Sequence, residues 1–324
     1  MVRPGTVVAA LLLAALALVP ALAGAFGEPY YVRLFTRILV FALAALGLNL
    51  VLGYGAMVSF GHAMYIGIGA YAVGMLSAGG VASGWAHLGV ALLAGGAIAA
   101  LVGAICLRTS GMAFIMITLA FAQMLYFLAV SLREYGGDDG LRIATPSDFG
   151  GVDLADANTL YYVAFGVLLA VLFAFWRLID SRFGMVLRGC KGNARRMAAL
   201  GFPTLRYQLA AYVISALVCV LAGVLLANLT KFVAPSYMAW TVSGELIVMA
   251  VLGGLGTLLG PVVGAAALLL LEEGLTSLKL GVPWLDELLN QHWLAVIGLF
   301  ILLVVLVLRR GLYGWLAAPQ ARKP

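Results

Sequence analysis

Ten stretches of mainly apolar residues, each about as long as a bilayer is thick, constrain this chain more than any other feature. They cover residues 7–26, 34–52, 57–78, 86–107, 111–131, 159–178, 207–229, 241–258, 260–280 and 290–308. A membrane-spanning helix needs about 20 such residues, and continuous rather than alternating apolar runs disfavour a β-barrel. The sequence therefore predicts an all-α, polytopic transmembrane helical bundle of about ten spans. Residues 1–324 are expected to form a single transmembrane domain.

The composition argues against the common classes of soluble protein. Of the 324 residues, 64% are hydrophobic and only 10% are charged, whereas soluble domains are about 25% charged. This excludes an ordinary soluble enzyme, a nucleic-acid-binding domain and a disordered chain. The three cysteines, Cys106, Cys190 and Cys219, are scattered and suggest neither a disulfide framework nor a zinc site.

The charged residues of the loops predict the orientation of the spans. Residues 177–206 contain seven basic residues and one acid, Asp180, whereas the loop 132–158 contains six acids against Arg133 and Arg142. Loops rich in Lys and Arg stay in the cytoplasm. The segment 182–206 is therefore expected to be cytoplasmic and the loop 132–158 periplasmic. Ten spans then leave the N- and C-termini in the cytoplasm.

The first apolar stretch has two interpretations. Arg3, the run 7–19 and the small residues at 21–23 resemble a signal peptide with a cleavage site. The length of the run favours a retained span. Cleavage would leave nine spans with the same sidedness. The charge distribution of the loops therefore does not decide whether residues 1–26 are a retained span or a cleaved signal peptide.

Motifs of membrane-associated catalysis are absent. No lysine follows a glycine, so the chain lacks a phosphate-binding loop and cannot itself be a P-loop ATPase. His62, His87 and His292 lie in different segments, and neither HExxH nor GxSxG occurs. We therefore predict no catalytic residue, no metal site and no cofactor in this chain, which is not expected to be an enzyme.

A glycine-rich stretch at residues 49–71 places polar side chains inside apolar runs. The polar residues are Asn49, Ser59, His62 and Tyr65, and the glycines expected to be structural are Gly53, Gly55, Gly61 and Gly67. Backbone that leaves a helix within a membrane needs internal partners or a wet cavity. One interpretation is a broken helix lining a solute path. Tight helix packing around buried, satisfied polar groups explains the same residues equally well.

A second glycine-rich stretch, residues 251–264, predicts a tight cytoplasmic turn that starts a new helix at Pro261. Its structural glycines are Gly253, Gly254, Gly256 and Gly260. A plain connecting turn is the simpler interpretation. The sequence at 251–256 also echoes that at 51–55, which suggests an internal repeat of the kind found in transporters. Two unrelated turns explain the echo equally well.

Three carboxylates lie in or at the ends of the spans, where ionisable residues are costly and often functional. Glu245 is near the outer edge of its run. Glu272 and Glu273 lie either about midway along the span 260–280 or at the outer end of a shorter helix, which is the simpler interpretation. We expect Glu245, together with Asn49, Ser59, His62 and Tyr65, on or near a solute path. So few carboxylates disfavour a proton-coupled carrier.

The basic segment 182–206 contains signals for a short helix. Asn193 is a suitable N-cap for residues 194–200, Gly201 suits the C-terminal cap, and Pro203 stops the helix. Met197 and Leu200 should share one face. A helix this short is unstable alone, which favours docking against a partner over a merely solvated loop.

These features resemble a known family when taken in order along the chain. The stretch at 49–71, the segment 182–207 and the stretch 244–264 together resemble the LivM-type permease subunit of branched-chain amino-acid ABC importers, also called the LivH/LivM family. The similarity runs over roughly residues 35–310. It implies pairing with a paralogous LivH-type permease, with two cytoplasmic ATPase subunits that bind ATP and Mg, and with a periplasmic solute-binding protein.

The resemblance also implies a coupling helix from Asn193 to Gly201 that inserts into the ATPase. The residues carried over to this role are Arg188, Lys191, Asn193, Arg195, Arg196, Met197, Ala199, Leu200, Gly201 and Arg206. The implied location is the bacterial inner membrane, and the implied solutes are branched-chain amino acids. Family members also import other amino acids, urea or short amides. A stand-alone secondary transporter or channel for a small solute is the alternative function.

Overall fold

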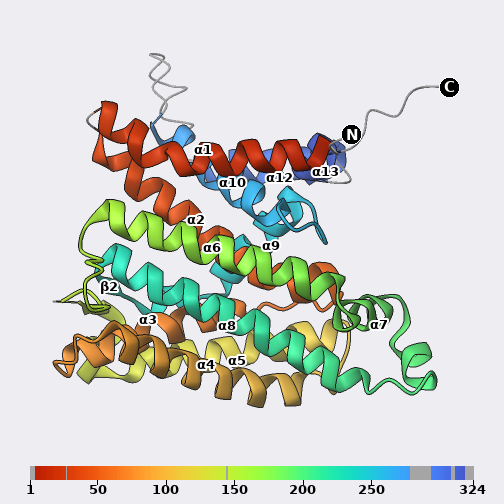
Figure 1. Cartoon of the computed structure of the whole chain (residues 1–324). Helices are drawn as coiled ribbons and strands as arrows, with labels where there is room; N and C mark the ends of the chain where they lie inside the picture. Colours follow the sequence, from red (N-terminus) through yellow and green to blue (C-terminus); the bar gives the residue numbers. More distant parts are fainter. Residues whose placement is uncertain (1–3, 27, 144, 278–292, 308–310, 318–324) are drawn as a thin grey trace.

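The structure is a computed structural model that describes residues 4–26, 28–143, 145–277, 293–307 and 311–317 (Figure 1). The helices are α1 Pro4–Phe26, α2 Pro29–Asn49, the π-helix η1 Leu50–Tyr54, α3 His62–Ala78, α4 Gly84–Cys106, α5 Met112–Ser131, the short 3-10 helices η2 Arg133–Tyr135 and η3 Gly137–Asp139, α6 Ala157–Asp180, α7 Arg182–Ala199, α8 Thr204–Thr230, the 3-10 helix η4 Pro235–Met238, α9 Trp240–Gly253, α10 Gly260–Ser277, α12 Trp293–Val307 and α13 Gly311–Ala317. The two short strands are β1 Leu141–Arg142 and β2 Phe232–Val233.

The prediction of a polytopic helical membrane protein is confirmed. The described part of each of the ten predicted apolar stretches coincides with a helix, although the exact bounds differ; residues 278–280, 290–292 and 308 of the last two stretches lie outside the described residues. Within the described residues, five helices are long and apolar enough to cross a membrane. They are Pro29–Tyr54, Gly84–Cys106, Met112–Ser131, Ala157–Asp180 and Thr204–Thr230. The described apolar parts of α1, α9 and α12 are shorter.

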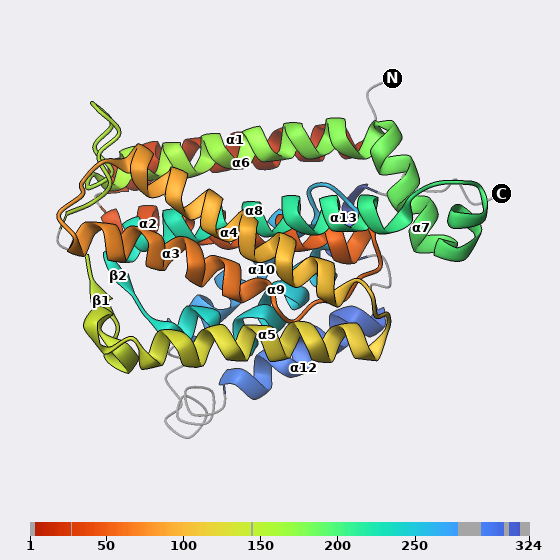
Figure 2. The same ribbon diagram turned by 90° about the horizontal axis from the view of Figure 1, so that it is seen from below.

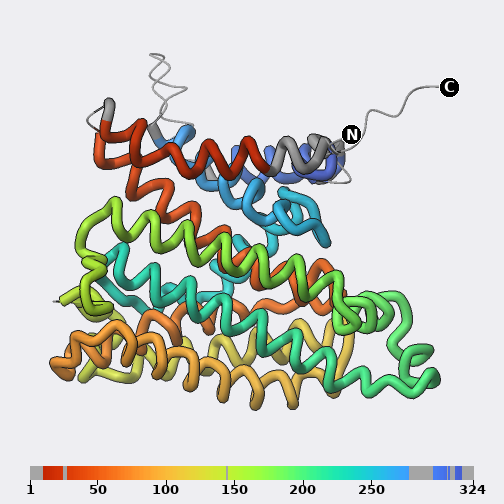
Figure 3. The backbone as a smooth tube through the Cα atoms, in the orientation of Figure 1, coloured from red at the N-terminus to blue at the C-terminus, as the bar shows by residue number. Residues whose placement is uncertain are grey.

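Helices α2 and α8 form the centre of the bundle. Both are largely buried, and α8 packs against α2, α3 and α4. The red and blue helices from the two ends of the sequence lie together on one side, and α3, α4 and α5 lie on the other (Figure 3). The outer faces of α4, α5 and α6 are exposed and apolar, as expected for surfaces that meet lipid or another hydrophobic chain.

Glycines allow the central helices to approach closely. A Cβ atom at Gly223 of α8 would overlap the carbonyl oxygen of Ile66 in α3, and one at Gly69 of α3 would overlap the carbonyl oxygen of Val220. A Cβ atom at Gly47 of α2 would lie 2.9 Å from the carbonyl oxygen of Ser215. Small residues at helix contacts replace the hydrophobic driving force that a membrane interior does not supply.

The loop 132–158 and the segment 182–206 lie at opposite ends of the molecule. Figures 1 and 2 both place α7 at one end, which we call the α7 end. At the other end β1 pairs antiparallel with β2, with Leu141 opposite Val233. Asp156 caps α6 there by accepting hydrogen bonds from the N–H and O–H of Thr159, and these bonds lower the pKa of its carboxyl. The assignment of the α7 end to the cytoplasm stays a prediction.

The structure corrects three details of the sequence analysis. Residues 182–192 are helical rather than a loop, because Val186, Leu187 and Cys190 form a buried stripe along α7. The third span begins at residue 62 rather than 57, because residues 55–61 are irregular. The helix expected over 241–258 ends at residue 253, since Gly254 and Gly256 adopt φ of 121° and 72°, which favours glycine.

The close packing of α8 on α3 can be tested with one methyl group. We expect Gly223→Ala to lower the free energy of unfolding by about 1–3 kcal/mol, because the methyl overpacks a backbone contact. The measurement is the thermal unfolding midpoint of the chain purified in detergent. Gly166→Ala is the matched control, since a Cβ atom there meets no heavy atom within 4 Å. Equal midpoints for the two variants would contradict this account of the packing.

Candidate functional site

The irregular segment between η1 and α3, together with the start of α3, is held by hydroxyl groups from three places. The N–H of Phe60 donates to Thr118 Oγ1 of α5 at 3.3 Å, and that of Gly61 donates to Ser59 Oγ at 3.2 Å. The N–H of Ala63 donates to Ser243 Oγ of α9 at 3.0 Å. Broken helices are tolerated at membrane depth when side chains supply the missing hydrogen bonds. These hydrogen bonds therefore give the segment a defined conformation within the fold.

His62 is fully buried and both of its ring nitrogens have partners. Nδ1 lies 2.9 Å from Ser59 Oγ, and Nε2 lies 2.9 Å from Ser215 Oγ. Ser215 donates its own proton to the carbonyl oxygen of Gly47 at 2.6 Å. Ser215 must then accept from His62, which places the proton of a neutral imidazole on Nε2. The histidine links the irregular segment to α8 and, through Ser215, to α2.

Tyr65 extends this cluster of buried polar residues. Its hydroxyl donates to the hydroxyl of Tyr212 at 3.2 Å, and the rings of His62, Tyr65 and Tyr212 meet edge to face with centroids 5.4–6.1 Å apart. Ser59, His62 and Tyr65 are all fully buried. In this conformation these residues pack inside the protein, and their role along a solute path stays a prediction.

Asn49 joins the two glycine-rich stretches. Its Nδ2 donates to the carbonyl oxygen of Thr257 at 2.8 Å, and its Oδ1 accepts from the N–H of Gly256 at 3.1 Å. A Cβ atom at Gly53 would lie 2.5 Å from the backbone nitrogen of Gly256. The two segments that echo each other in sequence therefore meet in space, and one amide side chain holds them together.

The glycines expected to be structural occupy tight or left-handed positions. A Cβ atom at Gly61 would lie 2.8 Å from the carbonyl oxygen of Thr118, and one at Gly55 would lie 2.7 Å from Met57 Cε. Glycines where a Cβ atom would overlap a neighbouring atom or where φ is positive include Gly53, Gly67, Gly253, Gly254, Gly256 and Gly260. This packing agrees with the interpretation of the first stretch as a close helix contact and of the second as a tight turn.

Lys191 connects α7 to the first glycine-rich stretch. Its ammonium donates to the carbonyl oxygen of Gly53 at 2.6 Å. Gly53 belongs to η1 and lies one helical turn after Asn49. Asn49 in turn makes the hydrogen bonds to the turn at 256–257. A continuous chain of hydrogen-bonded groups therefore runs from α7 to the turn between α9 and α10.

The distal part of α7 has the predicted caps. Asn193 leaves the helical region with φ of −162°, and its Oδ1 accepts from the N–H of Arg196 at 2.9 Å. Gly201 has φ of +89°, and the N–H of Phe202 returns to the carbonyl oxygen of Met197 at 3.2 Å, which is a glycine-terminated helix end. Two adjacent helical pieces therefore meet at Asn193.

The surface of this distal part is apolar at its tip and basic around it. Leu200 is 66% exposed, and Phe202 and Leu205 are exposed beside it. We call these three residues the α7 tip. Met197 is only partly exposed, because its thioether packs on Gly189; the expectation that Met197 and Leu200 share one docking face stays a prediction. Exposed residues that are close to the tip in sequence are Arg195, Arg196, Ala199 and Arg206, and Arg188 is exposed in the first piece of α7.

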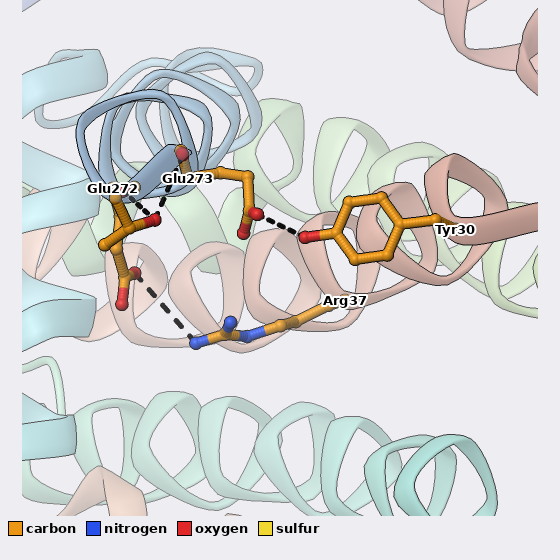
Figure 4. A network of polar contacts seen from close by, with 5 residues as sticks. Tyr30, Arg37, Glu272 and Glu273 are labelled. Atoms are coloured by element: carbon orange, nitrogen blue, oxygen red, sulfur yellow. Dashed lines mark hydrogen bonds and ion pairs between the residues drawn. The ribbon is translucent and has the colours of Figure 1, made fainter. Parts of the chain in front are cut away.

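The carboxylates of α10 lie at the end opposite α7. Glu272 and Glu273 point toward α2, where Arg37 lies 3.9 Å from Glu272 and the hydroxyl of Tyr30 donates to Glu273 (Figure 4). Helix α10 is described as far as Ser277, and the rest of the predicted span 260–280 lies outside the described residues, so the position of this pair at the outer end of a shorter helix stays a prediction. Glu245 and Glu272 line a small cavity of about 120 Å³ between α9, α10 and α12.

Sequence reasoning missed several partners of the predicted residues. Thr118, Tyr212, Ser215 and Ser243 are buried polar side chains within apolar helices. Their signal was present, since each is a polar residue inside an apolar run, but pairing them with His62 or Ala63 required the tertiary structure. In the part of the chain that the structure describes, no three His, Cys, Asp or Glu side chains converge as metal ligands.

Comparisons with known proteins agree with this arrangement. Residues 30–307 match the family described as branched-chain amino acid transport system, permease component. The chain belongs to this family. It is 27% identical over 266 residues to the high-affinity branched-chain amino acid transport system permease protein LivM of Salmonella typhimurium, covering 75% of this chain. The aligned part spans only 63% of that LivM protein.

Two further relatives show how far the similarity extends. The chain is 27% identical to the branched-chain permease protein LivH of Escherichia coli over 299 residues, which cover 85% of this chain and 91% of LivH. It is 28% identical to the autoinducer 2 import system permease protein LsrC of Photorhabdus luminescens over 137 residues, 40% of this chain and 41% of LsrC. All three relatives are named as permease proteins, so membership of a permease family rests on similarity over most of the chain.

Proposed function

We propose that this chain is the permease subunit of an ABC importer in the bacterial inner membrane. It moves branched-chain amino acids, or a related small neutral or zwitterionic solute, into the cytoplasm by alternating access. Its partners are a paralogous LivH-type permease, two ATPase subunits that bind ATP and Mg, and a periplasmic solute-binding protein. The observation that carries the proposal is the capped, exposed part of α7, which Lys191 ties to η1 directly after α2.

The α7 tip is the surface that docks onto an ATPase. Leu200 is 66% exposed although it closes a well-capped helix surrounded by arginines. An exposed apolar cluster with a polar rim has the composition of a protein-binding surface. The surrounding arginines favour an acidic groove on the partner. The carry-over of the coupling role to Asn193 through Gly201 agrees with these properties.

The hydrogen bonds behind the α7 tip give the docking a mechanical consequence. A shift of α7 acts on Gly53 through Lys191, and Asn49 passes the displacement to the turn at Gly256 and Thr257. That turn joins α9 to α10, which carry Glu245 and Glu272 near the other end of the molecule. ATP-driven motion of α7 therefore reaches the helices that face the outer side.

The buried polar cluster supports a small solute without strong net charge. Asn49, Ser59, His62 and Tyr65 are at most 1% exposed, and neutral hydroxyl, amide and imidazole groups surround them. Opening a path past them requires the irregular segment 55–61 to separate from Thr118, and the first turn of α3 to separate from Ser243. Branched-chain amino acids fit this chemistry, and so do other amino acids, urea and short amides.

The docking role of the tip predicts the effect of a charge at its centre. Leu200→Asp should abolish solute-stimulated ATP hydrolysis by the assembled importer, because the mutation buries a carboxylate at the interface. The subunit should still insert in the membrane. The measurement is ATPase activity in proteoliposomes with and without the solute-loaded binding protein.

Gly192→Asp is the control for that experiment. It adds the same charge at an exposed position of α7 where a side chain meets no atom within 4 Å. This variant should retain stimulation. Normal stimulation in Leu200→Asp would move the coupling site elsewhere on the chain.

The role of Lys191 predicts a loss of coupling without a loss of docking. Lys191→Met removes a charge-assisted hydrogen bond, which is worth about 1.5–3 kcal/mol, and should lower the ratio of solute transported to ATP hydrolysed about tenfold or more. Lys191→Arg should restore most of the ratio, and Arg182→Met at the exposed start of α7 should leave it unchanged. An unaltered ratio in Lys191→Met would show that the bond to Gly53 carries no motion.

The assembly itself provides the test against a stand-alone transporter or channel. The tagged chain, purified from native membranes, should bring along a second hydrophobic permease and two ATPases, which mass spectrometry identifies. Recovery of the chain alone, stable and active in transport with an ion gradient, would overturn the importer proposal.

A further inference from the structure

A cavity of about 400 Å³ opens at the α7 end of the molecule, beside the bond between Lys191 and Gly53. Its walls come from the irregular segment at 55–58, the turn 107–111 between α4 and α5, the middle of α7, and Gln208 near the start of α8. The volume lies in the range of protein ligand sites, about 300–1,000 Å³. No partner described above explains this cavity.

The charges of the cavity select an anion. Arg108 and Lys191 line it, and no Asp or Glu is among its lining residues. Within the described part of the chain, neither cation has a carboxylate within 4.0 Å, since the ion pair found there joins Arg37 and Glu272. Lys191 uses one of its three donors on Gly53, and the guanidinium of Arg108 has no hydrogen-bond partner among the described residues. Two cations with free donors therefore face one hollow.

The position of the cavity selects the source of the anion. Helix α4 ends at Cys106 and α5 begins at Met112, so Arg108 lies where membrane-crossing helices end and lipid headgroups begin. Next to the turn, Met112 is 69% and Met116 54% exposed on the outer face of α5. These side chains offer acyl chains an apolar surface directly beside the cationic cavity. A soluble anion would make no use of that surface.

We propose that this cavity binds the phosphate headgroup of an anionic phospholipid, held between Arg108 and Lys191. Basic pockets between helices at the membrane surface have the chemistry that recognises such headgroups. A bound phosphate ties the turn between α4 and α5 to α7 and leaves the bond from Lys191 to Gly53 in place. The lipid thereby becomes part of the structure that positions α7, whatever protein docks on the α7 tip.

Native mass spectrometry of the full chain in detergent tests the proposal. The probes are phosphatidylglycerol and phosphatidylcholine with identical acyl chains. We expect one phosphatidylglycerol per chain, preferred about fivefold or more over phosphatidylcholine, since a basic residue near the membrane surface contributes about 1 kcal/mol. Arg108→Gln should remove most of this preference, and Arg108→Lys should keep it. Equal retention of the two lipids by the unmodified chain would overturn the proposal.

Two further arms separate this site from its alternatives. Arg177→Gln removes an exposed charge from the last turn of α6, outside the cavity, and should leave lipid retention unchanged. An equal loss in this variant and in Arg108→Gln would reduce the effect to bulk charge and overturn the proposed site. Glycerol 3-phosphate carries the same phosphate without acyl chains and should not displace the lipid at equal concentration. Displacement would make the cavity a site for a soluble anion and overturn the lipid assignment.

Arg108→Gln carries the test because it leaves the fold intact. The Arg108 side chain makes no hydrogen bond or ion pair with the described residues, so its loss should not change the elution volume on size exclusion. Lys191→Gln is the second variant and should lower phosphatidylglycerol retention in the same direction. Full retention in both variants would overturn the proposal independently of ATP hydrolysis or transport.

Discussion

The structure depends on one constraint, which is that irregular backbone inside a membrane must find its hydrogen bonds within the protein. Residues 55–61 leave the helical conformation, and Thr118 and Ser59 accept the free N–H groups of Phe60 and Gly61, while Ser243 accepts that of Ala63 in the first turn of α3. These hydroxyls come from α5, from the segment itself and from α9, so the break in the helix depends on the packing of those helices around it. The same requirement explains why polar side chains are found in the most buried part of an otherwise apolar bundle.

A second feature of the structure is that two glycines and one asparagine together hold two turns in contact. Gly53 and Gly256 permit two turns to approach closely, and Asn49 supplies a donor and an acceptor where the turns meet. An alanine at either glycine would push the turns apart and leave the amide without partners. Lys191 adds the remaining contact by bonding the carbonyl of Gly53. The close approach of the two turns, the hydrogen bonds of Asn49 and the bond from Lys191 therefore form one polar joint, which connects α2, α7, α9 and α10.

The sequence predicts those parts of the fold that follow from apolar length and local capping. The ten apolar runs became helices, and Asn193 and Gly201 cap the distal part of α7 as their chemistry requires. It could not predict that α3 starts at His62, because the partners that stabilise the break lie 58 and 180 residues away. The packing of Met197 was missed for a similar reason, since Gly189 creates the space that its side chain fills. Long-range partners of single polar residues are the information that one sequence does not contain.

Charged side chains lie at the two ends of the bundle, on either side of the buried polar cluster. Arg37, Glu245 and Glu272 lie at one end of the bundle, and Arg108 and Lys191 line the cavity at the other. Between them the buried cluster consists of hydroxyls, the amide of Asn49 and one histidine, both of whose nitrogens are satisfied by serines. An ion with strong net charge would meet no counter-charge there and would pay its full desolvation penalty. A neutral or zwitterionic solute can exchange hydrogen bonds with the same groups as the helices separate, which is why the polar joint and the proposed solute belong together.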